Sequence, residues 1–314
     1  MILNSCFLIS VSIVTAVCIL LWQRYTRLPV AKRQKYLEYS QPSPVGMIDF
    51  VFTFAIWLGA PAATLIFLPF DITDLENLSA NQRNVLYIVL ASAQLLSCLL
   101  ILVYLGLIRY GSLSWMLNLR PSLSNQVVLA AKAFCMIVPG VLAVQALLSL
   151  LVPYEHDTLS QLAENFSAMT VFATWLGAVV SAPICEELVF RGVLQSWLQR
   201  AFARKSERDR ITEVTGGWPE PADGKDKTPE PISIEVKRIQ WWLPILISSG
   251  LFAVIHLGQG AAPIPLFLFA TGLGFLFRYS GSLVPCIILH FMLNGFTMFW
   301  MTLQLIFEPV TKTV

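Results

Sequence analysis

Two adjacent carboxylates and an arginine interrupt an otherwise apolar stretch of this sequence. Glu186, Glu187 and Arg191 lie in SAPICEELVFRG (residues 181–192), and the preceding VFATWLGAVV (residues 171–180) carries no charge. Ionisable side chains inside apolar spans are rare and usually face a partner or a cavity. Glu187 and Arg191 are four residues apart, so on a helix they share a face and can pair. Glu186 is rotated from Glu187 by about 100° and stays available for chemistry.

Two of the three histidines lie in apolar segments further along the chain. His256 ends the sequence LFAVIH, four residues after Phe252, and His290 begins HFMLN, four residues before Asn294. At a helical rise of 1.5 Å per residue, Glu186 lies about 21 Å, His256 about 22 Å and His290 about 12 Å from the inner end of its helix. In a hydrocarbon core of roughly 30 Å, the three side chains can converge near the middle or in the inner half.

Such a set of side chains can hydrolyse an amide bond. A glutamate beside a histidine can hold and deprotonate a water molecule, the role expected of Glu186 and His256. A second histidine and an amide can donate hydrogen bonds to the oxyanion of a tetrahedral intermediate, the role expected of His290 and Asn294. Cys185 is a poorer choice of nucleophile because no basic group is placed to form its thiolate. The chain has neither a GxSxG elbow nor an HExxH motif.

Membrane spans are the elements that must hold these residues. Hydrophobic residues make up 56% and charged residues 13% of the 314 residues, and the mean hydropathy is +0.68, which is too apolar for a soluble domain. Continuous apolar runs without period-two alternation predict an all-α, polytopic bundle of about eight transmembrane helices and exclude a barrel. The last three runs include two short ones, so seven spans or one re-entrant segment is an alternative. The runs cover residues 2–23, 46–70, 85–108, 127–153, 170–199, 241–258, 262–278 and 282–307.

Basic residues gather in alternate loops. Arg83 and Lys312 are the only Lys or Arg in the remaining loops and the C-terminal tail. The positive-inside rule makes the basic loops cytoplasmic and places both termini outside the cytoplasm. The expected localisation is therefore an integral, multi-pass protein, in the plasma membrane of a bacterium. The basic loops carry 5, 2, 9 and 1 Lys or Arg, which is 17 of the 21 in the chain, at residues 24–45, 109–126, 200–240 and 278–281.

The chain divides into an N-terminal transmembrane region of four helices, residues 1–165, and a catalytic region, residues 166–305. An insert at 203–240, rich in Pro, Gly and charge, is expected to be a flexible cytoplasmic loop. Asp49 and Lys132 lie near the inner ends of their spans and are expected to snorkel towards water. The cysteines lie in apolar segments without a CxxC pair, so we expect small buried hydrophobic side chains and no disulfide or zinc ligands. They are Cys6, Cys18, Cys98, Cys135, Cys185 and Cys286.

Three motifs carry a family resemblance. EELVFRG, FAVIH and HFMLN, in this order, resemble the motifs of the CPBP (or Abi) family, which contains type II CAAX prenyl endopeptidases and bacteriocin-processing proteins. The resemblance covers roughly residues 168–305 and implies an intramembrane, glutamate-dependent endopeptidase. It implies the same roles for the glutamate, histidines and asparagine named above, and structural support from Glu187, Arg191 and Phe252. The implied partners are the lipid bilayer and a membrane-associated or lipidated peptide or protein substrate, with no nucleic acid.

Other interpretations of the same residues remain open. A zinc-dependent version of the protease would use Glu186, His256 and His290 as the three ligands of an open catalytic site. We favour a site that requires no cofactor, because Asn294 suits an oxyanion better than zinc and no carboxylate is evident behind either histidine. A transporter could use the same side chains as a relay, although no internal repeat is apparent. A non-catalytic membrane adaptor is the third alternative.

Overall fold

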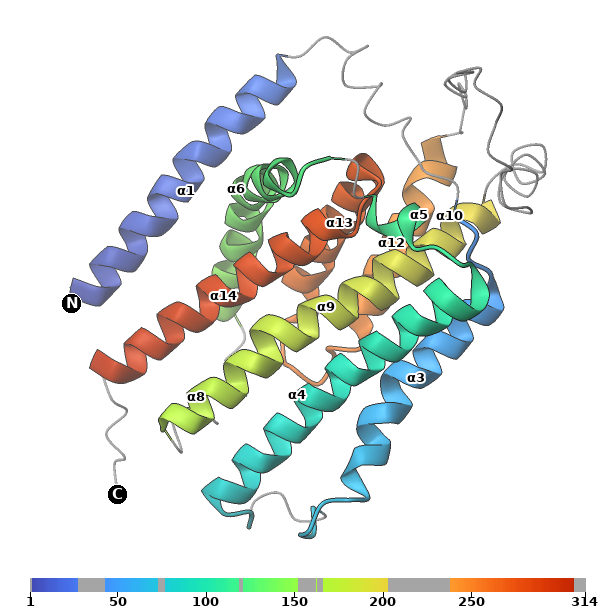
Figure 1. Cartoon of the computed structure of the whole chain (residues 1–314). Coiled ribbons are helices and arrows are strands. Elements are labelled where there is room, and N and C mark those ends of the chain that lie inside the picture. Colours follow the sequence, from blue (N-terminus) through green and yellow to red (C-terminus); the bar gives the residue numbers. More distant parts are fainter. Residues whose placement is uncertain are drawn as a thin grey trace.

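The fold is a bundle of helices. The computed structural model describes residues 2–27, 43–72, 77–118, 121–151, 162, 166–202 and 238–307, and most of the predicted insert at 203–240 lies outside them. Helices are the regular elements of these described ranges (Figure 1), which confirms the predicted all-α class. They are α1 (Ile2–Thr26), α3 (Met47–Leu65), α4 (Ala80–Val103), η1 (Tyr104–Arg109), α5 (Ser114–Leu117), α6 (Leu123–Ser149), α8 (Ala168–Trp175), η2 (Leu176–Ser181), α9 (Ala182–Glu187), η3 (Leu188–Gln195), α10 (Ser196–Phe202), α12 (Arg238–Val254), α13 (Pro263–Ser280) and α14 (Val284–Phe307).

The helices correspond to the predicted membrane spans. Each of the eight apolar runs coincides with a helix or with a continuous series of helices in the described part of the chain. Many of their apolar side chains face outwards; Phe67 is 84% exposed, Ile66 80% and Leu107 77%. This exposure suits lipid tails, because a bilayer removes the cost of leaving apolar surface uncovered. Within the described residues, five segments are long and apolar enough to cross a membrane, and Trp241–Val254 is a shorter apolar helix. The five are Met47–Leu65, Ala80–Arg109, Leu123–Ser149, Ala168–Phe202 and Val284–Phe307.

The centre of the bundle is the long rod that runs from α8 to α10. In Figure 1 this rod lies between α4 and α14, while α3 lies at one edge of the bundle and α1 at the opposite edge. Helix α1 packs along α6, where the indole nitrogen of Trp22 donates to the carbonyl of Met136 at 3.0 Å. Helices α12 and α13 cover another face of the rod. The carboxylates of the sequence motif lie in a stretch of this rod, residues 185–196, in which every residue except Glu186 is buried.

Two π-helical segments, η2 and η3, flank the six residues of α9 that carry the carboxylates. A serine stands at the end of each π-segment, Ser181 as the last residue of η2 and Ser196 directly after η3. Each hydroxyl donates to a carbonyl five residues earlier, Ser181 to Leu176 at 2.9 Å and Ser196 to Arg191 at 3.1 Å. Single π-turns inside α-helices often occur at functional sites. Here they change the phase of the helix on both sides of Glu186 and Glu187.

The structure corrects two sequence predictions outside the motifs. Asp49 does not snorkel; its side chain is 0% exposed because donors from Gly46, just before α3, from η1 and from the following turn surround it. Lys132, by contrast, is exposed. The prediction that no cysteines pair is also wrong, since Cys98 of α4 and Cys185 of α9 form a disulfide. These two residues are 87 positions apart, and spacing alone could not reveal that their helices pack together.

Candidate active site

The first part of the site is a buried ion-pair network. Glu187, which is 0% exposed, accepts from the Arg191 guanidinium at 3.0 Å, as their four-residue spacing predicted. The same Oε1 atom accepts from Nδ1 of His290 at 2.8 Å, and a second Arg191 nitrogen donates to the carbonyl of Ala270 in α13 at 3.2 Å. Since the Glu187 charge is balanced by Arg191, its carboxylate holds the histidine in place.

Phe252 of α12 lies at the centre of this network and connects it to His256. The Arg191 guanidinium stands 4.8 Å from the centre of the Phe252 ring, a cation–π contact. Phe190 packs edge-on against the same ring at 5.3 Å. The His256 ring lies 5.0 Å away, and its Nδ1 is 2.8 Å from the Phe252 carbonyl. The predicted support residues are therefore in contact with both histidines.

These hydrogen bonds fix the tautomers of the histidines. A carbonyl only accepts, so Nδ1 of His256 carries the proton and Nε2 keeps a lone pair that can accept from water. Nδ1 of His290 likewise donates to the Glu187 carboxylate. Nε2 of His290 can therefore donate to an oxyanion only when both ring nitrogens are protonated.

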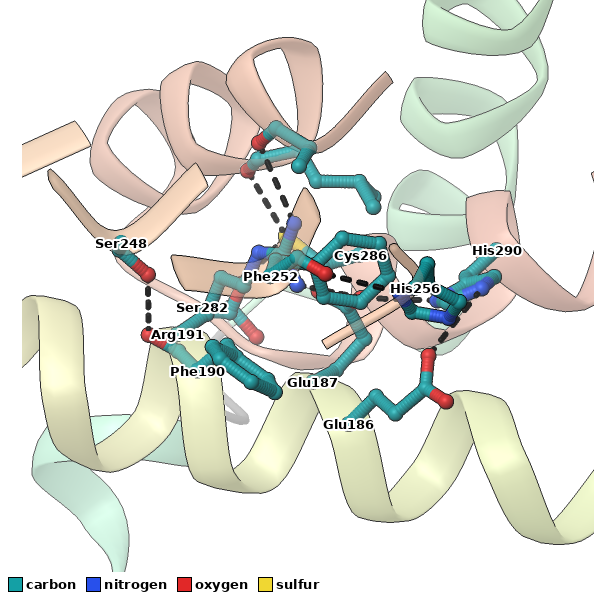
Figure 2. A network of polar contacts seen from close by, with 12 residues as sticks. Glu186, Glu187, Phe190, Arg191, Ser248, Phe252, His256, Ser282, Cys286 and His290 are labelled. Carbon is teal, nitrogen blue, oxygen red and sulfur yellow. Dashed lines mark hydrogen bonds and ion pairs between the residues drawn. The ribbon is translucent and has the colours of Figure 1, made fainter. Parts of the chain in front are cut away.

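Glu186 points away from the ion pair and towards a cavity. Its Oε2 atom is 3.8 Å from Nε2 of His290, and its side chain is 13% exposed. Figure 2 shows His290 reaching the carboxylates of both Glu186 and Glu187, with His256 beside Phe252. The two neighbouring glutamates thus differ in the way expected from their rotation on the helix. Glu187 is bound through Oε1 to both Arg191 and His290, whereas Glu186 has only the longer contact with His290.

Asn294 is anchored to η2 through a carbonyl that a proline leaves available. Its side-chain nitrogen donates to the carbonyl of Ala178 at 2.8 Å. In a π-segment the Ala178 carbonyl would accept from the N–H five residues later, but that residue is Pro183, which has no N–H. The N–H four residues later, that of Ala182, donates to the Gly177 carbonyl instead. Ala178 can therefore accept from Asn294, whose second N–H is left for another acceptor.

A cavity of about 260 Å³ joins the candidate residues. Glu186, His256, His290 and Asn294 all line it. The sequence did not indicate that α6, within the predicted N-terminal region, supplies part of the wall. That part consists of Val141, Gln145, Leu148 and Ser149.

The donor arrangement does not match a three-ligand zinc site. In the described ranges, no group of three His, Cys, Asp or Glu side chains is close enough to hold a metal ion. Nδ1 of His256 and Nδ1 of His290 are both used in protein hydrogen bonds, which leaves Nε2 as the atom of each ring that can contact a ligand. The expectation that no carboxylate lies behind either histidine is wrong. Glu187 is hydrogen-bonded to Nδ1 of His290 and supports the ring as a carboxylate supports a metal-binding histidine.

Comparison with protein families agrees with the motifs. Residues 168–218 and 229–296 match the family model described as type II CAAX prenyl endopeptidase, Rce1-like. This region is Rce1-like. The match confirms the family predicted from the three motifs and implies a CAAX-type intramembrane protease. It includes all the candidate site residues but not α6, and neither the curated proteins nor the solved structures compared with the chain gave a match.

Proposed function

We propose that this chain is an intramembrane endopeptidase in which Glu186 activates the attacking water. One observation carries the proposal. Glu186 faces the cavity and meets Nε2 of His290 only at 3.8 Å, beyond hydrogen-bond distance, whereas the neighbouring Glu187 is hydrogen-bonded to both Arg191 and His290. A carboxylate held in a partly dry site, with room for water beside it, is suited to act as a general base.

The water lies between Glu186 and Nε2 of His256 in this mechanism. Glu186 takes a proton from the water as its oxygen bonds to the peptide carbonyl carbon. Glu186 then returns this proton to the amine nitrogen as the carbon–nitrogen bond breaks. The water oxygen and its second hydrogen stay on the new carboxyl group, the transferred proton ends on the amine, and the Glu186 carboxylate is regenerated.

The oxyanion of the tetrahedral intermediate accepts hydrogen bonds from Asn294 and His290. Asn294 offers the N–H that it does not give to Ala178. His290 offers Nε2–H in its doubly protonated form, held by Glu187. Preorganised donors of this kind are effective because they need no reorientation as negative charge develops.

The proposed reaction requires no cofactor. Water activation and oxyanion stabilisation are each assigned to side chains, so the zinc alternative would leave Asn294 without a role. Protein purified in the presence of strong chelators should keep its activity and contain well under one zinc per chain. Loss of activity on chelation that zinc restores would contradict this part of the proposal.

The setting is a bilayer, with a membrane-associated or lipidated peptide or protein as substrate. We propose that both termini lie outside the cytoplasm, because the positive-inside rule makes the basic loops cytoplasmic, and that the membrane is the plasma membrane of a bacterium. Most of the wall of the cavity is apolar, which suits substrate segments that are themselves embedded in lipid.

Cleavage of a defined peptide by the purified protein tests the proposal. The full chain in liposomes is mixed with a lipidated reporter peptide, and products are identified by mass spectrometry. Glu186→Gln should lower turnover at least about a hundredfold, the scale of losing a general base. The transporter and adaptor alternatives predict no cleavage by the wild-type protein, and that result would overturn the proposal.

A further inference from the structure

The cavity lies on one side only of the candidate catalytic residues. On the long rod, the lining residues Ala178, Ala182 and Glu186 come before the ion pair, whereas every residue from 187 to 195 is buried. On α14, which runs in the opposite direction, the lining residues begin at His290 and continue to Met301. Both helices therefore place the cavity towards the start of α8 and the end of α14.

Two further elements open on this same side. Leu148 and Ser149 line the cavity at the last turn of α6, and Gln259 lines it from the connection between α12 and α13. In Figure 1 the start of α8 and the ends of α6 and α14 lie at one end of the bundle. Ser149 and Gln259 are exposed, so they mark the mouth of the cavity.

The opposite side of the site is closed by packing. Cys286 and Leu289 of α14 are 0% exposed, as is Phe269 of α13. The Glu187–Arg191 pair and its bond to Ala270 fill the space between these helices and the rod. A peptide therefore reaches Glu186 from the mouth and not through the ion pair.

Charge identifies the membrane side on which each end lies. At the closed end, Arg109 is bound to Asp49 at 3.1 Å, Arg278 lies 4.8 Å from the Trp241 ring, and Arg200 donates to Pro44. The connections at the open end, residues 150–167 and 255–262, contain no Lys or Arg. The positive-inside rule makes the closed end cytoplasmic.

We propose that the site is fed from the non-cytoplasmic face of the membrane. Its substrates are then short apolar peptide segments presented at that face, not C-terminal tails presented by cytoplasmic proteins. The volume of about 260 Å³ is below the roughly 300–1,000 Å³ of most ligand pockets, so it accommodates only the residues beside the scissile bond. Leu148, Met298 and Met301, away from Glu186, form an apolar wall for a side chain. The substrate class rests on the proposed function, whereas the side of access does not.

Accessibility of engineered cysteines tests the side of access without requiring catalysis. Ser149→Cys and Gln259→Cys place thiols at the mouth, and Ser112→Cys, also exposed, places one at the closed end. Each full-length variant is treated with a membrane-impermeant maleimide in right-side-out and in inside-out vesicles. The wild-type protein, treated in the same way, gives the background labelling of the native cysteines. We expect the mouth variants to be labelled in right-side-out vesicles and Ser112→Cys in inside-out vesicles. The reverse pattern, or no labelling of the mouth from either side, would overturn the proposal.

A reporter experiment then separates the proposal from the proposed function. One apolar reporter peptide is added to the outside of each kind of vesicle, with Glu186→Gln as the inactive control. Cleavage in right-side-out vesicles alone supports both proposals. Cleavage in inside-out vesicles alone overturns the side of access and leaves the protease assignment intact. Labelling as expected without cleavage in either preparation overturns the proposed function and leaves the side of access standing.

Discussion

Asp49 and Glu186 are both carboxylates within helices long and apolar enough to span a membrane, but their surroundings differ. Asp49 is 0% exposed and accepts from the Gly46 nitrogen at 2.8 Å, Tyr104 at 2.9 Å, Arg109 at 3.1 Å and the Tyr110 hydroxyl. Glu186 is 13% exposed, and its carboxylate lies 3.8 Å from Nε2 of His290. A saturated carboxylate stabilises the fold, whereas one with spare acceptor capacity beside a cavity can take a proton.

The same contrast extends to the two arginines. Arg191 is 1% exposed and its loss would leave Glu187 buried without its cation, so Arg191→Ala should lower the free energy of unfolding by about 3–5 kcal/mol. Arg109 is 51% exposed, and Asp49 keeps three other donors, so Arg109→Ala should cost at most about 1 kcal/mol. Equilibrium unfolding of both variants in detergent micelles measures the difference. Equal losses of unfolding free energy in the two variants would show that the Arg191–Glu187 and Arg109–Asp49 pairs stabilise the fold equally.

Asn294→Ala should affect catalysis without unfolding the protein. Removing one donor to the oxyanion should lower kcat by about 10²–10³-fold. Thr297→Ala is the matched control, because Thr297 also lines the cavity but its hydroxyl donates to carbonyls of its own helix. A near-silent Asn294→Ala would remove the asparagine from the mechanism and favour the zinc alternative.

Pro183→Ala should have a smaller effect through the same asparagine. The new N–H can donate to Ala178 and compete with Asn294 for that carbonyl. We expect kcat to fall about two- to tenfold, the value of ~0.5–1.5 kcal/mol for one hydrogen bond. Kinetics of the double variant Pro183→Ala/Asn294→Ala provide the check, because it should lose no more activity than Asn294→Ala alone. Additive losses would mean that the proline acts elsewhere.

The sequence predicted the features that depend on local pattern. Long apolar runs predicted the helices because only a helix satisfies its backbone within lipid. The four-residue spacing of Glu187 and Arg191 predicted their ion pair, because a helix brings these positions together. The order of the three motifs predicted the family.

Contacts between distant segments could not be predicted in this way. Asp49 is buried by donors 55 to 61 residues away in the chain, and hydropathy does not report which helices become neighbours. The contact of Glu187 with His290 spans 103 residues. The α6 wall of the cavity and the π-segments around α9 also depend on tertiary packing, which overrides local propensity.

Paired conservative substitutions test the central claim most directly. Glu186→Gln and Asp49→Asn each replace a carboxylate with an amide of similar size, and both turnover per folded molecule and Tm are measured for each. We predict that Glu186→Gln loses turnover at an unchanged Tm, because it removes a base. Asp49→Asn should lower Tm and keep turnover, because it weakens only bonds that hold helices together. An active Glu186→Gln, or an Asp49→Asn variant that is inactive at normal Tm, would contradict the account.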